Sequence, residues 1–239
     1  MRTAMTIASR ELGSYFRQPA GWIIVSLYLL LAGLVFATSV LVPGRPASLR
    51  EFFAISGWLL LPVAPAISMR LIAEELRSGT IENLLTAPVS AWALVIGKYI
   101  GACAFLAAML TPTLVYPVLL FMHASPTPDI GPVIAGYSCL LLLGALYLAL
   151  GLLASTLTNN ATLAFMITLF GILAFIFAGV AGDAAPAALK PAIYQIAVGP
   201  RVLDFARGVL DTSHIIFFAA VSAYFVLLSV AVMEVRRWR

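Results

Sequence analysis

Charged residues are scarce in this chain. Only 10% of its 239 residues are Asp, Glu, Lys or Arg, whereas 62% are hydrophobic. A soluble domain carries about 25% charged residues. Several uncharged runs approach the roughly 20 residues that a helix needs to cross a bilayer. The composition therefore excludes an ordinary soluble domain and indicates a polytopic membrane protein.

Cysteine and histidine are almost absent, with two residues of each. Cys103 and Cys139 lie inside apolar runs, so we expect buried free thiols rather than a disulfide or a metal site. His123 and His214 lie at the ends of apolar runs, where a structural or surface role outweighs metal ligation. We expect this chain to bind no metal and no cofactor.

Motifs for enzyme chemistry are also missing. There is no HExxH pair and no pair of membrane aspartates. Serines within the runs, such as Ser56, Ser138 and Ser222, have no histidine at a plausible depth. The net charge of +4 is small, and no basic patch interleaves with aromatic residues, which disfavours a nucleic-acid partner. We therefore expect a protein that is not an enzyme and binds no nucleic acid.

The chain lacks its own means of using nucleotide or ion gradients. Its apolar runs are nearly free of the ionisable residues that mark ion paths and proton relays. Lys98, near the start of the third run, is expected to snorkel to the membrane interface. Gly97-Lys98 has no upstream glycine of a phosphate-binding loop, and Tyr99 replaces the hydroxyl residue. A nucleotide-driven function would thus require a second chain.

The apolar runs predict one all-α membrane domain, residues 1–239, with six transmembrane helices. The expected spans are about 21–42, 52–69, 92–122, 133–157, 161–181 and 215–233. Pro62 and Pro65 in the second span, and Pro112 and Pro117 in the third, predict kinks.

Two further segments are amphipathic. Residues 2–17 separate apolar and basic faces, which predicts a helix lying in the membrane interface. A short outer helix is expected at about 200–211, with Pro200 in its first turn. Gly97 and Gly101 form a GxxxG step where another helix can approach closely.

The distribution of lysine and arginine predicts the orientation. With the N-terminus inside, nine of these residues lie inside and five outside. The inner set is Arg2, Arg10, Arg17, Arg70, Arg77, Lys98, Arg236, Arg237 and Arg239, and the outer set is Arg45, Arg50, Lys190, Arg201 and Arg207. The positive-inside rule then places both termini in the cytoplasm and the protein in the inner (cytoplasmic) membrane.

The densest run of charge lies between the second and third spans, in residues 68–98. Gly79 and Thr80 are typical of a helix stop followed by a helix start. Ile81, Leu84 and Leu85 recur at helical spacing, Pro88 ends the helix, and Ser90 can cap the next one. The pattern indicates a short cytoplasmic helix at about 80–87, with an ordinary polar loop as the alternative.

This stretch resembles a known family, the ABC-2 type transporter permeases. The resemblance rests on Arg70, Glu74, Glu75, the run Ser78-Gly79-Thr80-Ile81-Glu82, Leu84, Leu85, Ala87, Pro88, Gly97 and Lys98, which are similar to the family's charged stretch, its S-G-T-x-E-x-L-L-x-x-P pattern and its G-K. Within the family, the run RVLDFARGVLDTSHIIFF is similar to a segment of gliding-motility-associated permeases. The permeases associated with copper-site maturation are a further relative.

The resemblance implies a mechanism. In this family two permease subunits, identical or different, pair in the lipid bilayer, and each docks a separate cytosolic ABC ATPase that binds ATP. A coupling helix between spans two and three enters a groove on the ATPase, so export follows ATP hydrolysis. The resemblance places the ATPase contact at Glu74, Glu75, Arg77, Ser78, Gly79, Thr80, Ile81, Glu82, Leu84, Leu85 and Pro88.

Two alternatives stay open from the sequence. The same coupling helix serves a membrane scaffold that transmits force to a partner, as in gliding or secretion, instead of moving a solute. A membrane-embedded enzyme is the other alternative, and the lack of a polar cluster in the spans counts against it. The identity of the transported substrate is open.

Overall fold

The computed structural model describes residues 2–41, 48–79, 90–124, 129–184, 186, 195 and 197–237. Within these ranges every regular element is a helix or a helical turn. Six helical stretches are long and apolar enough to cross a membrane, namely Pro19–Val40, Arg50–Ser78, Ala91–His123, Ile130–Leu157, Ala161–Ala178 and Thr212–Arg236. The prediction of an all-α membrane protein with six spans is confirmed.

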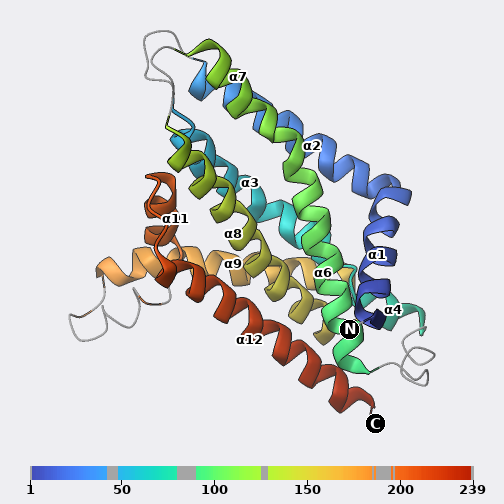
Figure 1. Ribbon diagram of the computed structural model, residues 1–239. Helices are drawn as coiled ribbons and strands as arrows, with labels where there is room; N and C mark the ends of the chain where they lie inside the picture. The colour runs from blue at the N-terminus through green and yellow to red at the C-terminus, as the bar shows by residue number, and fades with distance from the viewer. Residues whose placement is uncertain are drawn as a thin grey trace.

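The helices follow one another in a simple order (Figure 1). They are α1 (Arg2–Arg17), α2 (Pro19–Val35) with a π-helical end (Phe36–Val40), α3 (Arg50–Ser68), α4 (Ala73–Ser78), α6 (Ala91–Leu110), a 3-10 turn (Thr111–Leu114), α7 (Val115–His123), α8 (Ile130–Leu157), α9 (Ala161–Ala184), α11 (Gly199–Ala206) and α12 (Thr212–Arg237). The two chain ends lie at the same end of the helix bundle, together with α1 and α4 (Figure 1). We call this the terminal end.

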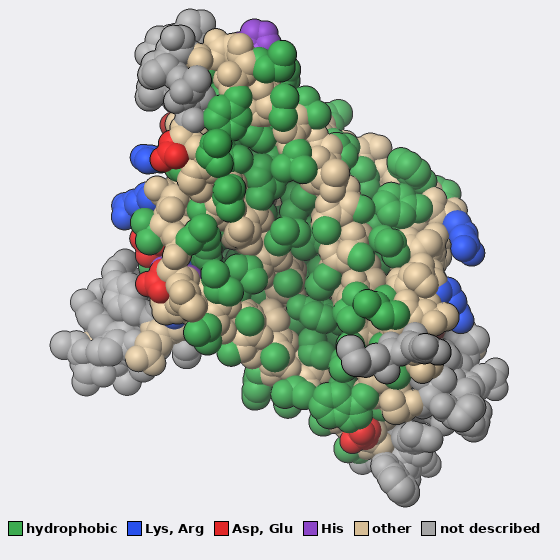
Figure 2. Space-filling model, viewed as in Figure 1, with side chains coloured by type: hydrophobic (Ala, Val, Ile, Leu, Met, Phe, Trp, Pro, Cys, Tyr) green, Lys and Arg blue, Asp and Glu red, His purple; other side chains and the backbone are tan. Residues whose placement is uncertain are grey.

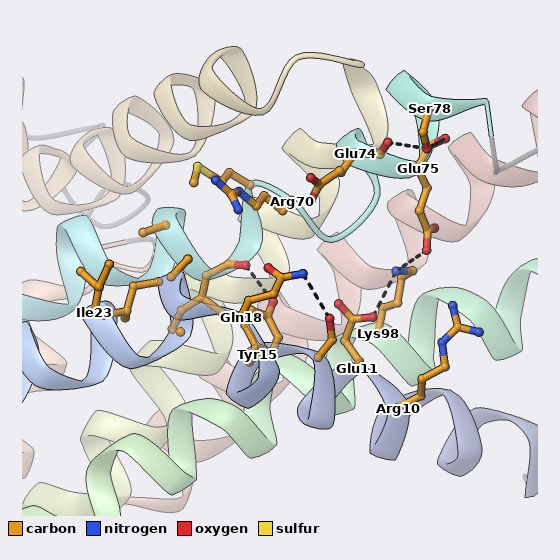
Figure 3. Close-up of a pocket in the computed structure, with 17 residues that line it drawn as sticks. Arg10, Glu11, Tyr15, Gln18, Ile23, Arg70, Glu74, Glu75, Ser78 and Lys98 are labelled. Atoms are coloured by element: carbon orange, nitrogen blue, oxygen red, sulfur yellow. Dashed lines mark hydrogen bonds and ion pairs between the residues drawn. The ribbon is translucent and has the colours of Figure 1, made fainter.

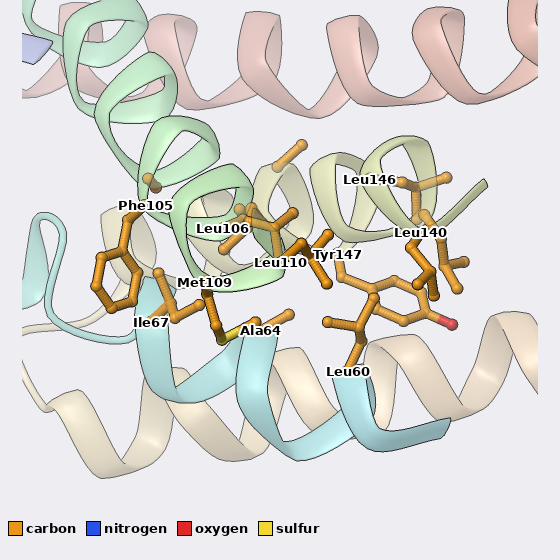
Figure 4. Close-up of a cluster of buried hydrophobic side chains, with 14 of the residues drawn as sticks. Leu60, Ala64, Ile67, Phe105, Leu106, Met109, Leu110, Leu140, Leu146 and Tyr147 are labelled. Atoms are coloured by element: carbon orange, nitrogen blue, oxygen red, sulfur yellow. The ribbon is translucent and has the colours of Figure 1, made fainter. Parts of the chain in front are cut away.

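Helix α8 lies at the centre of the bundle. It packs against α3, α6, α9, α11 and α12. In its most apolar window 72% of the residues are buried, compared with 28% in the first and last spans. Leu140, Leu146 and Tyr147 of α8 join Leu60 of α3 and Leu106 of α6 in one hydrophobic cluster (Figure 4). The core of the domain therefore forms between the second, third and fourth spans.

The third span is interrupted, as its prolines predict. Helix α6 ends at Leu110, a 3-10 turn containing Pro112 follows, and α7 continues to His123. Proline has no amide hydrogen to donate, so an α-helical hydrogen bond is missing at this position. The chain forms the more tightly wound 3-10 turn here. The hydroxyl of Thr111 donates to the carbonyl oxygen of Ala107 at 2.8 Å.

The segment before the last span differs from its prediction. Helix α11 begins at Gly199 but ends at Ala206, five residues before the expected end at 211. Gly208 has a φ of +88°, a left-handed conformation that stops a helix. Asp211 then caps α12, since its carboxylate accepts a hydrogen bond from the amide of Ser213 at 2.8 Å. The last span consequently starts at Thr212, earlier than the expected residue 215.

The surface matches a membrane protein. Figure 2 shows hydrophobic side chains across the middle of one face, with Lys, Arg, Asp and Glu side chains near its margins. Helix α2 contributes exposed apolar residues such as Ile23, Leu27 and Leu30. In water such a surface would be unfavourable, whereas hydrocarbon chains of lipid cover it at no cost.

Candidate functional site

The site centres on Lys98 of α6, whose side chain is only 4% exposed. Its ammonium nitrogen lies 2.8 Å from Oε1 of Glu75 on α4 and 3.3 Å from Oε2 of Glu11 on α1 (Figure 3). A buried ammonium group needs such partners because its desolvation is costly. The sequence prediction that Lys98 snorkels to the interface is wrong, since two carboxylates hold it inside the protein.

Two glycines bring α1 onto α6 next to this lysine. A Cβ atom built on Gly97 would lie 2.8 Å from the carbonyl oxygen of Ala4, and one built on Gly101 would lie 2.8 Å from Cβ of Glu11. Either contact is too short for a real side chain, so only glycine permits this approach. The helix that approaches the GxxxG step is therefore the N-terminal helix, and the contact places Glu11 within reach of Lys98.

Tyr15 fixes the other end of α1. Its ring stacks on Phe105 of α6 with 4.5 Å between centroids, and its hydroxyl donates to the carbonyl oxygen of Ile67 at 2.8 Å. Burial raises the pKa of Tyr15 well above its usual value, and the nearby Glu11 raises it further. Tyr15 thus stays a neutral hydrogen-bond donor that ties α1 to the end of α3.

Ser155 of α8 positions α4 from the opposite side. Its hydroxyl oxygen accepts hydrogen bonds from the amides of Ile72 at 2.9 Å and Ala73 at 2.8 Å. The same hydroxyl donates to the carbonyl oxygen of Met69 at 3.2 Å. These bonds satisfy amides at the start of α4 that have no partner within the helix. Sequence reasoning missed Ser155, because nothing in the local pattern reports a contact over 82 residues.

The end of α4 follows the sequence prediction. Gly79 adopts a left-handed φ of +69° directly after Ser78, which confirms the predicted helix stop. On the far side of the charged stretch, the hydroxyl of Ser90 accepts a hydrogen bond from the amide of Ala93 at 3.2 Å and caps α6 as expected. The expected coupling helix itself, with Thr80, Ile81, Glu82, Leu84, Leu85 and Pro88, lies outside the described residues.

A family model for the ABC-2 family transporter protein matches residues 5–234. The chain belongs to the ABC-2 transporter family. A comparison with curated proteins finds no match. Membership in the ABC-2 family supports a permease subunit of an ABC transporter, embedded in the membrane by its six spans. The narrower resemblance to gliding-motility-associated permeases stays a prediction.

Several described residues of the ABC-2 resemblance form two groups in space. Glu75 and Lys98 meet in the ion-pair cluster, and Gly97 holds α1 beside it. Glu74, Arg77 and Ser78 lie on the exposed part of α4. The first group faces the bundle, and the second group is exposed. The carboxylates of Glu11 and Glu75 and the ammonium of Lys98 are engaged in contacts between helices.

Proposed function

We propose that this ABC-2 family member is the permease subunit of an ATP-driven export complex. A separate cytosolic ATPase binds ATP and docks on the stretch from Glu74 to Pro88, and two permease subunits pair in the membrane. The terminal end of the bundle faces the cytoplasm, in the orientation that the excess of inner lysine and arginine favours.

One observation carries the coupling part of this proposal. The ion pair between Glu75 and Lys98 joins the helix that enters residues 80–89 to the helix that leaves them. The two ends of the stretch are thereby fastened to each other and, through Glu11, to α1. A force applied to residues 80–89 would displace α4, α6 and α1 together, because the ion pairs limit bending between these helices.

Ser155 extends this connection to the centre of the bundle. Because its hydroxyl binds the backbone at Met69, Ile72 and Ala73, a displacement of α4 reaches α8 directly. Helix α8 contacts most of the other spans. We propose that ATP binding by the partner rearranges the spans along this route.

Co-purification tests the proposed function. The chain is co-expressed with candidate ABC ATPases, purified in detergent and reconstituted in nanodiscs, and ATP hydrolysis is measured with and without added compounds. We expect one ATPase to remain bound and its hydrolysis rate to respond to a substrate. If no ABC ATPase binds the intact chain in the membrane, the proposed function is wrong.

A further inference from the structure

The third span changes its winding at Thr111–Leu114, where a 3-10 turn separates α6 from α7. A 3-10 stretch inside a long helix often marks a hinge. Beyond the turn, α7 runs beside the second half of α2 (Figure 1). Of the nine residues of α7, only Pro117 and Leu120 are buried. Because few buried residues hold α7, the contacts at the turn determine its position.

Pro117 deprives a backbone acceptor of its usual donor. In an α-helix the carbonyl oxygen of Thr113 would accept a hydrogen bond from the amide of residue 117, and proline has no amide hydrogen. Thr113 is fully buried. A buried carbonyl group without a donor is costly, above all at membrane depth. A donor from outside this helix is therefore favoured at Thr113.

Tyr137 of α8 supplies such a donor. Its hydroxyl donates a hydrogen bond to the carbonyl oxygen of Thr113 at 2.8 Å. The hydroxyl of Thr113 donates to the carbonyl oxygen of Leu110 at 2.7 Å and lies 3.1 Å from the same tyrosine oxygen. Phe53 of α3 packs against the edge of the Tyr137 ring, with 5.1 Å between the ring centroids. The second and fourth spans thus place the tyrosine that holds the turn of the third.

A second contact joins α7 to the first span. The ring of Tyr116 stacks on Phe36, with 4.6 Å between the centroids. At Phe36 the helix α2 changes to its π-helical end, in which the amide of Leu41 donates to the carbonyl oxygen of Phe36 at 3.3 Å. Segments of π-helix occur frequently at functional sites. The first and third spans therefore both change their winding near the place where they touch.

We propose that the turn at Thr111–Leu114 is a hinge of the third span and that Tyr137 is the positioning residue that locks it. While its hydroxyl binds the Thr113 carbonyl, α7 is held in the observed direction. When this bond breaks, α7 and the π-helical end of α2 swing together relative to α6 and α8. Val118 and Met122 of α7 are exposed to lipid, which yields to such a movement. This hinge belongs to the permease itself and does not depend on the ATPase contact.

The distance between two spin labels tests the hinge. The labels are attached through Met122→Cys, near the exposed end of α7, and Leu157→Cys, at the exposed end of α8. The two native cysteines are removed by Cys103→Ala and Cys139→Ala. Double electron–electron resonance on the chain in nanodiscs then gives the distribution of label distances, with no ATPase present.

Tyr137→Phe keeps the ring and removes the donor. We expect a second label distance to gain about fivefold in population, as the net loss of one buried hydrogen bond predicts. Tyr224→Phe is the matched control, because Tyr224 is an exposed tyrosine of α12 and should leave the distribution unchanged.

Pro117→Ala distinguishes the hydrogen bond from packing of the tyrosine ring. This variant returns an amide that can donate to the Thr113 carbonyl, so it should narrow the distribution, and combined with Tyr137→Phe it should restore the wild-type distribution. An unchanged distribution in Tyr137→Phe, or a double variant as broad as Tyr137→Phe, would overturn the proposal. If Tyr137→Phe does not fold, Pro117→Ala alone decides, and a distribution as broad as that of the wild type would overturn the hinge.

Discussion

The ammonium group of Lys98 lies 2.8 Å from the carboxylate of Glu75, across 23 positions of sequence that include residues 80–89. This contact joins α4, before residues 80–89, to α6, after them. Glu11 ties the N-terminal helix α1 to the same lysine.

Lys98→Met is expected to destabilise the protein more than any change of its acidic partners. The variant removes the buried ammonium group that contacts both carboxylates, which costs up to about 3 kcal/mol in the free energy of unfolding. Glu11→Gln should be nearly neutral, since one ammonium and one carboxylate remain paired. Thermal unfolding in detergent measures both effects, and Lys98→Arg serves as the control that keeps the charge. Equal stability of Lys98→Met and the wild type would show that the cluster is not structural.

Gly101→Leu should detach α1 from the bundle. The new side chain would occupy the place of Glu11 Cβ and the backbone of Ala8. Ala8 is only 6% exposed, so a cysteine at this position reports the detachment through faster maleimide labelling in a Cys103→Ala, Cys139→Ala background. Gly199→Ala is the matched control, because a Cβ atom there would meet nothing within 4 Å. Unchanged labelling of the cysteine at position 8 in Gly101→Leu would contradict the glycine contact.

Ser155→Ala should loosen the start of α4. The amides of Ile72 and Ala73 would lose their acceptor, and each buried amide without a partner costs about 1–3 kcal/mol. Hydrogen exchange at residues 72–76 should become faster. Ser229→Ala is the control, because that hydroxyl donates only within its own helix, to the carbonyl oxygen of Phe225. If both variants exchange alike, Ser155 does not position α4.

The start of α12 should depend on pH. Hydrogen bonds from Ser213, chiefly from its backbone amide, hold the pKa of Asp211 below its usual value. Because the folded pKa is the lower one, the cap contributes fully above the ordinary aspartate pKa and is lost as the pH falls through the folded value. Hydrogen exchange at residues 212–216 should therefore rise in acid. Asp211→Asn should remove this dependence, and an unchanged acid response in that variant would exclude Asp211 as its source.

The sequence was sufficient for the elements that local patterns determine. Apolar runs predict the six spans, Gly79 predicts the end of α4, and Ser90 predicts the start of α6, because each depends on neighbouring residues. The expected end of the outer helix at 211 was wrong, because Gly208 takes the left-handed conformation and stops it early.

The candidate site was harder to predict from the sequence. The burial of Lys98 depends on Glu11, which is 87 positions away, and the position of α4 depends on Ser155, which is 82 and 83 positions away from the amides it binds. A single lysine near the end of a span gives the same sequence pattern whether its ammonium group reaches water or a buried carboxylate. Only the packing of α1 and α8 distinguishes these outcomes.

The amount of ABC ATPase that co-purifies with Leu84→Asp tests the central claim most directly. The proposed coupling helix would bury Leu84 in a groove of the ATPase, so a charge there should abolish the association while the six spans stay folded. Ile130→Asp, at the exposed start of α8, is the control and should retain the ATPase at the wild-type level. Wild-type association of Leu84→Asp would contradict the account.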